Sequence, residues 1–158
     1  MNRNGPSRVG ASGRGKRFVL IASQFHRSLS QSLVRGAARI LQQSGASARN
    51  IRILWVPGAF ELPVVASRVA RSRRRPHAIV ALGTLIRGDT PQYQVIAHAV
   101  AQGLTQVSVE TGIPVTFGVV VAETLAQARA RAGGTVGNRG VEAAHAALAV
   151  LHLLDRYT

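Results

Sequence analysis

The sequence predicts an α/β fold in which helices cover both faces of a parallel sheet. Four short segments are almost wholly apolar, as buried strands are, and the stretches between them carry apolar residues at helical spacing. Parallel strands need crossover connections, and helices in those crossovers hide both faces of the sheet. A chain of 158 residues with 46% hydrophobic residues is the size of one such domain. The expected strands are FVLIAS (18–23), IRILWV (51–56), AIVALGTLI (78–86) and VTFGVVV (115–121).

The first two strands are each followed by a segment with helical periodicity. Gly45 ends the first of these helices, and Pro57-Gly58 separates the second strand from the second helix. Each helix has an apolar face, which would pack on the sheet. The residues of these faces are Leu29, Leu33, Ala37, Ile40 and Leu41 in the first helix, and Leu62, Val65, Val69 and Ala70 in the second.

The third strand leads into a longer helix, and two more helices follow the fourth strand. Thr90 suits the N-cap of the long helix and Pro91 suits its first position. The last two helices are expected at 125–132 and at about 141–154. The predicted buried faces are Val95, Ala99, Gly103 and Val107 in the long helix, and Val141, Ala144, Leu148, Leu151 and Leu154 in the last one.

The N-terminal segment and the net charge bear on domain organisation and on partners. Residues 1–17 are rich in Gly, Ser, Arg and Asn and lack periodicity, so we expect a disordered basic tail before a single domain at 18–158. The net charge of +14 comes from 20 basic and 6 acidic residues. Because such a charge favours association with polyanions in general, it predicts at most non-specific nucleic-acid binding.

Several kinds of chemistry are excluded by composition. The chain has no cysteine, which removes disulfides, thiolate nucleophiles and cysteine-bound zinc. No GxGxxG motif follows the first strand and no GK[ST] motif occurs, so a dinucleotide or NTP enzyme is not expected. Histidines with metal-ligand spacing are not found either. We expect a cytoplasmic protein with no membrane segment and no signal peptide, since no long apolar run occurs.

The distinctive residues follow the strands, at the end where open parallel sheets bind ligands. They predict one pocket at that edge. Each also has a structural interpretation: Phe25 could stack on a planar ring or fill the core, and Glu61 could bind substrate hydroxyls or favour the helix dipole. The turn before Pro91 could hold an anion such as phosphate or only start a helix. The residues concerned are Phe25 and His26, the segment 57–61, the segment 87–90, and Thr124.

Four motifs, in this order and spacing, resemble the 6,7-dimethyl-8-ribityllumazine synthase family. They are PGAFELP (57–63), ALGTLIRGDT (81–90), PVTFGVV (114–120) and RAGGTVGNRGVEAA (131–144). The resemblance implies a three-layer, flavodoxin-like lumazine synthase fold and a homo-oligomer, either a pentamer or a multiple of pentamers. It also implies the condensation of 5-amino-6-(D-ribitylamino)uracil with 3,4-dihydroxy-2-butanone 4-phosphate, which releases phosphate and water and needs no cofactor and no metal.

The resemblance also implies a role for each matching residue. Phe25, with His26 at the rim, would stack on the pyrimidine ring, the backbone around Ala59 and Phe60 with the Glu61 carboxylate would hold the ribityl chain, and Leu85 and Ile86 would line the ring site. Gly88, Asp89 and Thr90 would cradle the phosphate. Phe117, Arg131 and Arg139 would come from the adjacent subunit, and Arg131 would be the counter-charge of the phosphate.

One position departs from the family pattern. The family usually has a histidine followed by an aromatic and an acidic residue after the phosphate turn, and this chain has Gln92-Tyr93-Gln94. Glutamine forms hydrogen bonds but does not titrate, so Gln92 cannot act as a general acid or base. Since acid–base help is typically worth about 10² to 10⁴-fold, a slower synthase is one outcome, with His26 as a partial substitute. The alternatives are a non-catalytic paralogue that binds a flavin precursor or serves as an assembly scaffold, and a shell whose basic tails collect polyanions.

Overall fold

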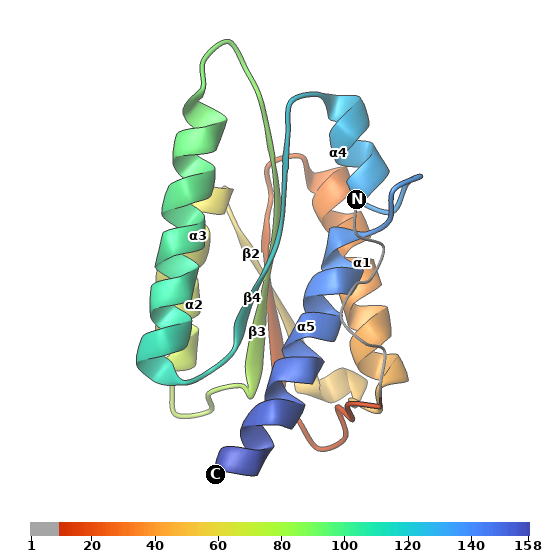
Figure 1. Cartoon of the computed structure of the whole chain (residues 1–158), viewed down its shortest axis with the longest axis vertical. Coiled ribbons are helices and arrows are strands. Elements are labelled where there is room, and N and C mark those ends of the chain that lie inside the picture. The colour runs from red at the N-terminus through yellow and green to blue at the C-terminus, as the bar shows by residue number, and fades with distance from the viewer. Residues whose placement is uncertain (1–9) are drawn as a thin grey trace.

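The computed structural model describes residues 10–158, which form a four-stranded parallel sheet with helices on both faces (Figure 1). The strand order is β2-β1-β3-β4, and all three strand pairs are parallel. The prediction of an α/β fold with a parallel sheet is confirmed. The strands are β1 (Phe18–Ser23), β2 (Ile51–Val56), β3 (Ala78–Ile86) and β4 (Val115–Ala122).

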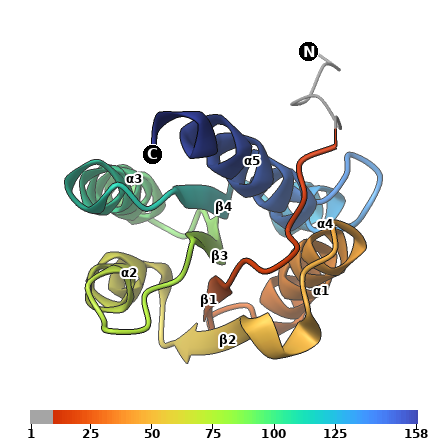
Figure 2. The ribbon, with the colours of Figure 1, turned by 90° about the horizontal axis from the view of Figure 1, so that it is seen from below.

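The helices form the two outer layers of the fold. Figure 2 shows α2 and α3 on one face of the sheet and α1, α4 and α5 on the other. Alternate residues of the central strands point to opposite faces, so Leu20 and Val80 contribute to one core cluster and Ile21 and Ile79 to the other. The helices are α1 (Arg27–Gln43), α2 (Leu62–Ala70), α3 (Gln92–Thr111), α4 (Leu125–Arg131) and α5 (Arg139–Leu154).

The predicted buried face of α3 is wrong for most of its length. Val95 is 67% exposed and Ala99 is also exposed, and of the predicted face only Val107 is buried. Apolar residues occur all round this helix, so their spacing did not fix which side meets the sheet. Gly103 touches Pro63 of α2, where a side chain would collide. The residues buried on α3 are Tyr93, Ala97, Val100, Leu104 and Val107.

The predicted cap of α3 is wrong, and the predicted stripe of the last helix is only partly confirmed. Thr90 does not cap α3, because the helix begins at Gln92 behind Pro91 and has no side-chain cap. Thr124 does cap α4, since its hydroxyl accepts a hydrogen bond from the Gln127 N–H at 3.1 Å. In α5 the stripe is buried at Ala144, Leu148 and Leu151, whereas Val141 is partly buried and Leu154 is 38% exposed.

The expected disordered tail at 1–17 falls in two parts. Residues 1–9 lie outside the described residues. Residues 10–17, in contrast, contact the domain: the Gly13 N–H donates to the Ser44 carbonyl at 2.9 Å, and the Lys16 ammonium lies 3.2 Å from the Asp155 carboxylate. Arg17 pairs with His77 through two hydrogen bonds of 2.8 Å each. The contacts of the domain therefore begin before residue 18, because backbone and charged groups hold a segment that has few apolar residues.

His77 fastens this segment to the start of β3. The Nδ1 of its imidazole accepts a hydrogen bond from the backbone N–H of Arg17, and the backbone N–H of His77 donates to the Arg17 carbonyl. Burial lowers the pKa of His77, and the positive charges of Arg17 and Lys16 lower it further.

No helix among residues 10–158 has the length and apolar character needed to cross a membrane.

We predict that His77 makes the protein less stable in mild acid. The unfolded chain binds this proton at a higher pH than the folded chain does, so the free energy of unfolding should fall as the pH drops below about 6.5. A His77→Gln variant, whose side chain can still accept a hydrogen bond but does not titrate, should show a weaker fall in thermal midpoint between about pH 7.5 and pH 5. The matched control is His152→Gln, at an exposed position of α5. An identical pH dependence in both variants would exclude this role for His77.

Candidate active site

A cavity of about 310 Å³ opens at the carboxyl end of the strands, between β3, the start of α3 and the loops after β1 and β2. This is the edge at which the sequence placed a pocket. Its lining comes from three separate segments of the chain. The lining residues are Phe25, His26, Gly58, Ala59, Phe60, Thr84, Leu85, Ile86, Gly88, Thr90, Gln92, Tyr93 and Ile96.

Two aromatic side chains stand exposed at this cavity. Phe25 is 66% exposed and Phe60 is 62% exposed, so neither fills the core. The Phe25 ring meets the His26 ring edge to face, with centroids 5.2 Å apart. His26 has a φ of +54°, the only positive φ of a non-glycine residue among residues 10–158. Backbone strain of this kind is often retained at functional sites. His26 directly precedes α1, and its side chain lines the cavity.

Glu61 closes the turn that carries Ala59 and Phe60. Its Oε2 accepts a hydrogen bond from the Gly58 N–H at 2.9 Å, across the short 3₁₀ turn Ala59–Glu61. A carboxylate in this place also interacts favourably with the positive N-terminal end of the dipole of the following helix α2. Glu61 does not line the cavity. The structure therefore gives Glu61 a role in shaping the loop, and its predicted contact with a ribityl chain stays a prediction.

A buried hydroxyl with no partner lies in the cavity wall. Thr84 of β3 is 1% exposed, and its Oγ1 has no hydrogen-bond partner among the described residues. A buried hydroxyl without a partner carries a desolvation cost, which a ligand hydroxyl or carbonyl would relieve. The sequence analysis assigned no role to Thr84, because a threonine inside an apolar strand resembles any other strand residue.

The expected phosphate turn lies between β3 and α3. Gly88 and Thr90 line the cavity, whereas Asp89 is exposed and does not. Gln92 lines it from the first residue of α3. The next residue, Tyr93, is 8% exposed, and its hydroxyl receives a hydrogen bond from the Gln94 side chain at 3.2 Å. The two glutamines that replace the family's titratable pair thus flank a tyrosine that lines the cavity.

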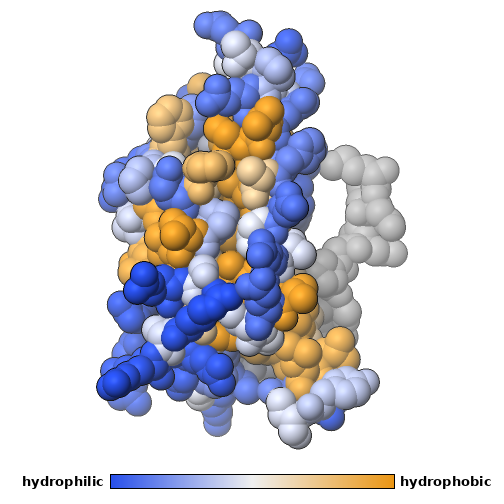
Figure 3. Space-filling view, turned by 90° about the vertical axis from the view of Figure 1, so that its left-hand side faces the viewer, coloured by the Kyte–Doolittle hydropathy of each residue, from blue (hydrophilic) through white to orange (hydrophobic). Residues whose placement is uncertain are grey.

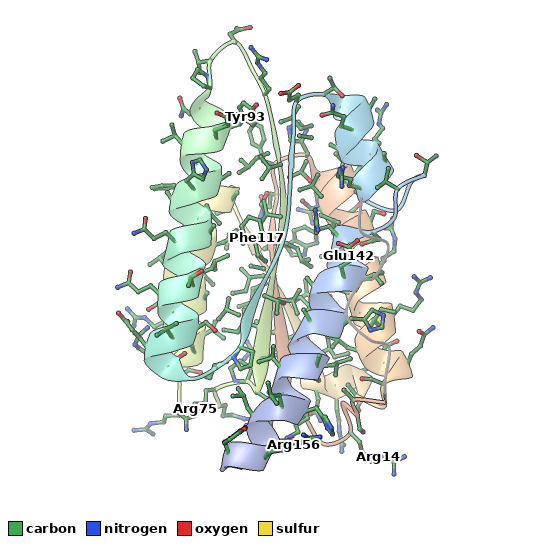
Figure 4. The ribbon with its side chains drawn as sticks, in the orientation of Figure 1. Arg14, Arg75, Tyr93, Phe117, Glu142 and Arg156 are labelled. Atoms are coloured by element: carbon green, nitrogen blue, oxygen red, sulfur yellow. The ribbon has the colours of Figure 1, made fainter. Side chains whose placement is uncertain are left out.

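Three predicted site residues lie away from this cavity within one chain. Phe117 is the third residue of the edge strand β4 and is 38% exposed (Figure 4). Arg131 and Arg139 line a separate, very small cavity with Glu142, and the Arg139 guanidinium pairs with the Glu142 carboxylate at 2.8 Å. The resemblance to the family predicts that all three serve the site of an adjacent subunit. That assignment stays a prediction.

The site contains side chains that stack and form hydrogen bonds, and few that titrate. Within residues 10–158 no group of three or more His, Asp or Glu side chains could hold a metal ion. The titratable groups that line the cavity are His26 and Tyr93. Sequence reasoning missed Thr84, Tyr93 and Ile96 as lining residues, although Thr84 lies inside the motif ALGTLIRGDT.

The strand order 2-1-3-4 and the cavity beyond the carboxyl ends define a flavodoxin-like α/β protein with a cavity at the edge of the sheet where such folds bind their ligands. Comparison with known proteins is more specific. The chain matches the family described as 6,7-dimethyl-8-ribityllumazine synthase over residues 15–155, and it belongs to that family.

Relatives that bear this name align with nearly the whole chain. The protein of Gemmatimonas aurantiaca is 48% identical over 144 residues, which cover 91% of this chain and 87% of the relative. The protein of Desulfotalea psychrophila is 42% identical over 141 residues, which cover 89% and 90%. That of Leuconostoc mesenteroides is 38% identical with the same coverage.

We predict that Glu61 stabilises its turn. A Glu61→Ala variant leaves the Gly58 N–H without its partner, and should lower the free energy of unfolding by about 1 kcal/mol, the usual cost of losing a capping side chain. Glu123→Ala is the matched control, because Glu123 is an exposed acidic residue after β4. Urea denaturation of the two variants measures the difference. Equal stability of both would show that the Glu61 carboxylate does not support the loop.

Proposed function

We propose that this chain condenses 5-amino-6-(D-ribitylamino)uracil with 3,4-dihydroxy-2-butanone 4-phosphate to give 6,7-dimethyl-8-ribityllumazine, with release of phosphate and water. The family membership supports this reaction, and one structural observation carries it. An exposed phenylalanine, an unpartnered threonine hydroxyl and the turn that opens α3 share one cavity of about 310 Å³. The cavity is of the size of small-molecule sites, which begin at about 300 Å³.

Each part of the cavity suits one part of the two substrates. The Phe25 ring can stack on the pyrimidine ring, with Leu85 and Ile86 beside it. The backbone around Ala59, which Glu61 holds in place, can bind the hydroxyls of the ribityl chain. The turn at Gly88 and Thr90 leaves backbone N–H groups at the start of α3, where a phosphate is favourable. Two reactants held side by side in this way gain rate from proximity alone.

The proposed site is completed by a neighbouring copy of the chain. Among residues 10–158 of one chain no arginine lines the cavity, so these residues offer the phosphate no guanidinium partner there. We propose that Arg131 and Arg139 of an adjacent subunit supply this charge and that Phe117 of that subunit covers the ring. This requires a homo-oligomer, for which we propose a pentamer or a multiple of pentamers. The chain has no cysteine, which accords with the cytoplasmic setting that we propose for it.

His26 is our candidate for proton transfer in place of the usual histidine. It lines the same cavity as Gln92, and no other histidine does. Histidine exchanges protons near neutral pH, whereas glutamine does not. Its fixed position before α1 directs the imidazole to the cavity that Gln92 shares. The competing function is a paralogue that binds the pyrimidine without reaction, which Gln92 and Gln94 favour.

An assay of the purified protein with both substrates tests the reaction, by the absorbance of the lumazine product. We expect product formation in the unmodified chain. His26→Gln should lower kcat by about 10-fold or more and flatten the pH profile between about pH 5 and pH 8, and Gln92→His should raise kcat. His98→Gln, an exposed position of α3 outside the cavity, is the matched control.

Two results would contradict parts of this proposal. Absence of product in the unmodified chain and in Gln92→His, with pyrimidine binding retained, would favour the non-catalytic paralogue. Product formation that His26→Gln leaves unchanged would remove His26 from the mechanism and leave the synthase assignment in place.

A further inference from the structure

A second cavity, of about 390 Å³, lies between β2 and α2 at the amino end of the sheet, opposite the candidate active site. Five arginines line it and no acidic residue does, and we call it the arginine groove. All five arginines are exposed to solvent. The lining residues are Arg17, Phe18, Val19, Arg49, Asn50, Arg52, Leu54, Arg68, Val69, Ser72, Arg74 and Pro76.

Regular secondary structure brings these arginines together. Arg52 and Leu54 lie two residues apart on β2 and so face the same side of the sheet. Arg68 is on α2, and Ser72 lies two residues beyond the end of this helix. Arg17 is held from two sides, since its N–H donates to His77 and its guanidinium donates to the Arg75 carbonyl at 3.0 Å. The wall of the groove is therefore preorganised.

The acidic residues of the chain do not neutralise this groove. The sequence has six of them. Glu110 and Asp155, which lie toward this end of the molecule, are already paired with Arg71 at 2.8 Å and with Lys16 at 3.2 Å. The other four stand in or after the loops that follow the strands, and residues 1–9 contain no acidic residue.

Further arginines lie at the same end of the molecule as the groove. Figure 3, which looks onto the side formed by α2 and α3, shows hydrophilic side chains gathered over the lower end. Figure 4 shows Arg14, Arg75 and Arg156 at that end, away from Tyr93 near the candidate active site. A concave surface lined by one sign of charge concentrates counter-ions of the opposite sign. The arginine groove therefore attracts anions, and the reaction does not use it.

We propose that the arginine groove binds a run of linked phosphate groups. The planar guanidinium fork matches two phosphate oxygens, and five forks in one cavity call for several phosphates rather than one. The one aromatic residue in the lining, Phe18, is 1% exposed, so no ring is available for base stacking. The groove can therefore contact the phosphate groups of a nucleic acid but cannot stack on its bases. Inorganic polyphosphate and the backbone of single-stranded nucleic acid both present this chemistry.

Calorimetric titration of the full chain with inorganic tripolyphosphate, and separately with an oligouridylate, tests the proposal at fixed ionic strength. Arg52→Ser with Arg68→Ser should weaken binding by roughly 10-fold or more, because charge-assisted hydrogen bonds are lost. The matched control is Arg14→Ser with Arg156→Ser, which removes the same charge from the same end but outside the groove. This control should change the affinity by less than about 2-fold. Arg3→Ser with Arg8→Ser tests the N-terminal segment in the same way.

The two ligands identify the source of the phosphates. Groove-dependent binding of tripolyphosphate alone points to free polyphosphate, and groove-dependent binding of the oligouridylate alone points to nucleic acid; both support the groove. Equal weakening by the groove and control variants, or loss of binding only in the Arg3 and Arg8 variant, would overturn the proposal. If the serine variant fails to fold, Arg52→Lys with Arg68→Lys keeps the charges and removes the forks. Unchanged affinity in that variant would also overturn the proposal.

Discussion

The common direction of the four strands is the constraint on which the rest of the structure depends. Because all strand pairs are parallel, the loops that follow the strands meet at one end of the sheet and the strand starts meet at the other. Phe25, Thr84 and Gln92, which are far apart in the sequence, become neighbours of one cavity for this reason. The same constraint leaves the opposite end free for a surface of different chemistry, the arginine groove. The two cavities at opposite ends of this small domain follow from a single property of its sheet.

The strands and most helix boundaries could be predicted from the sequence, because buried parallel strands are continuous apolar runs and the crossovers have helical periodicity. The buried face of α3 could not. Val95 and Val109 are apolar yet exposed, so periodicity alone did not show which side packs on the sheet. Thr90 was also misjudged as a cap, since Pro91 precedes the helix without any side-chain bond. Local chemistry predicted the elements, and tertiary packing decided their orientation.

The candidate site was predicted mainly through motif resemblance, and the structure adds what the motifs do not express. Glu61 bonds to Gly58 and shapes its loop, and Thr84 places an unpartnered hydroxyl at the cavity. Neither fact is visible in residue type or spacing. Phe117, Arg131 and Arg139 lie outside the cavity of their own chain, and their role at a neighbour's site stays a proposal. The sequence alone shows that Gln92 replaces a titratable residue. The structure is needed to show that His26 and Gln92 line the same cavity.

The most direct test of the central claim is an experimental structure of the protein with 6,7-dimethyl-8-ribityllumazine bound. The account predicts that the ring of this compound stacks on Phe25 at the carboxyl end of the sheet, with a polar ligand atom within hydrogen-bond distance of Thr84 Oγ1. It also predicts that the nearest Arg131 belongs to another copy of the chain. Binding of the compound at any other place, or a site completed by Arg131 of the same chain, would contradict the account.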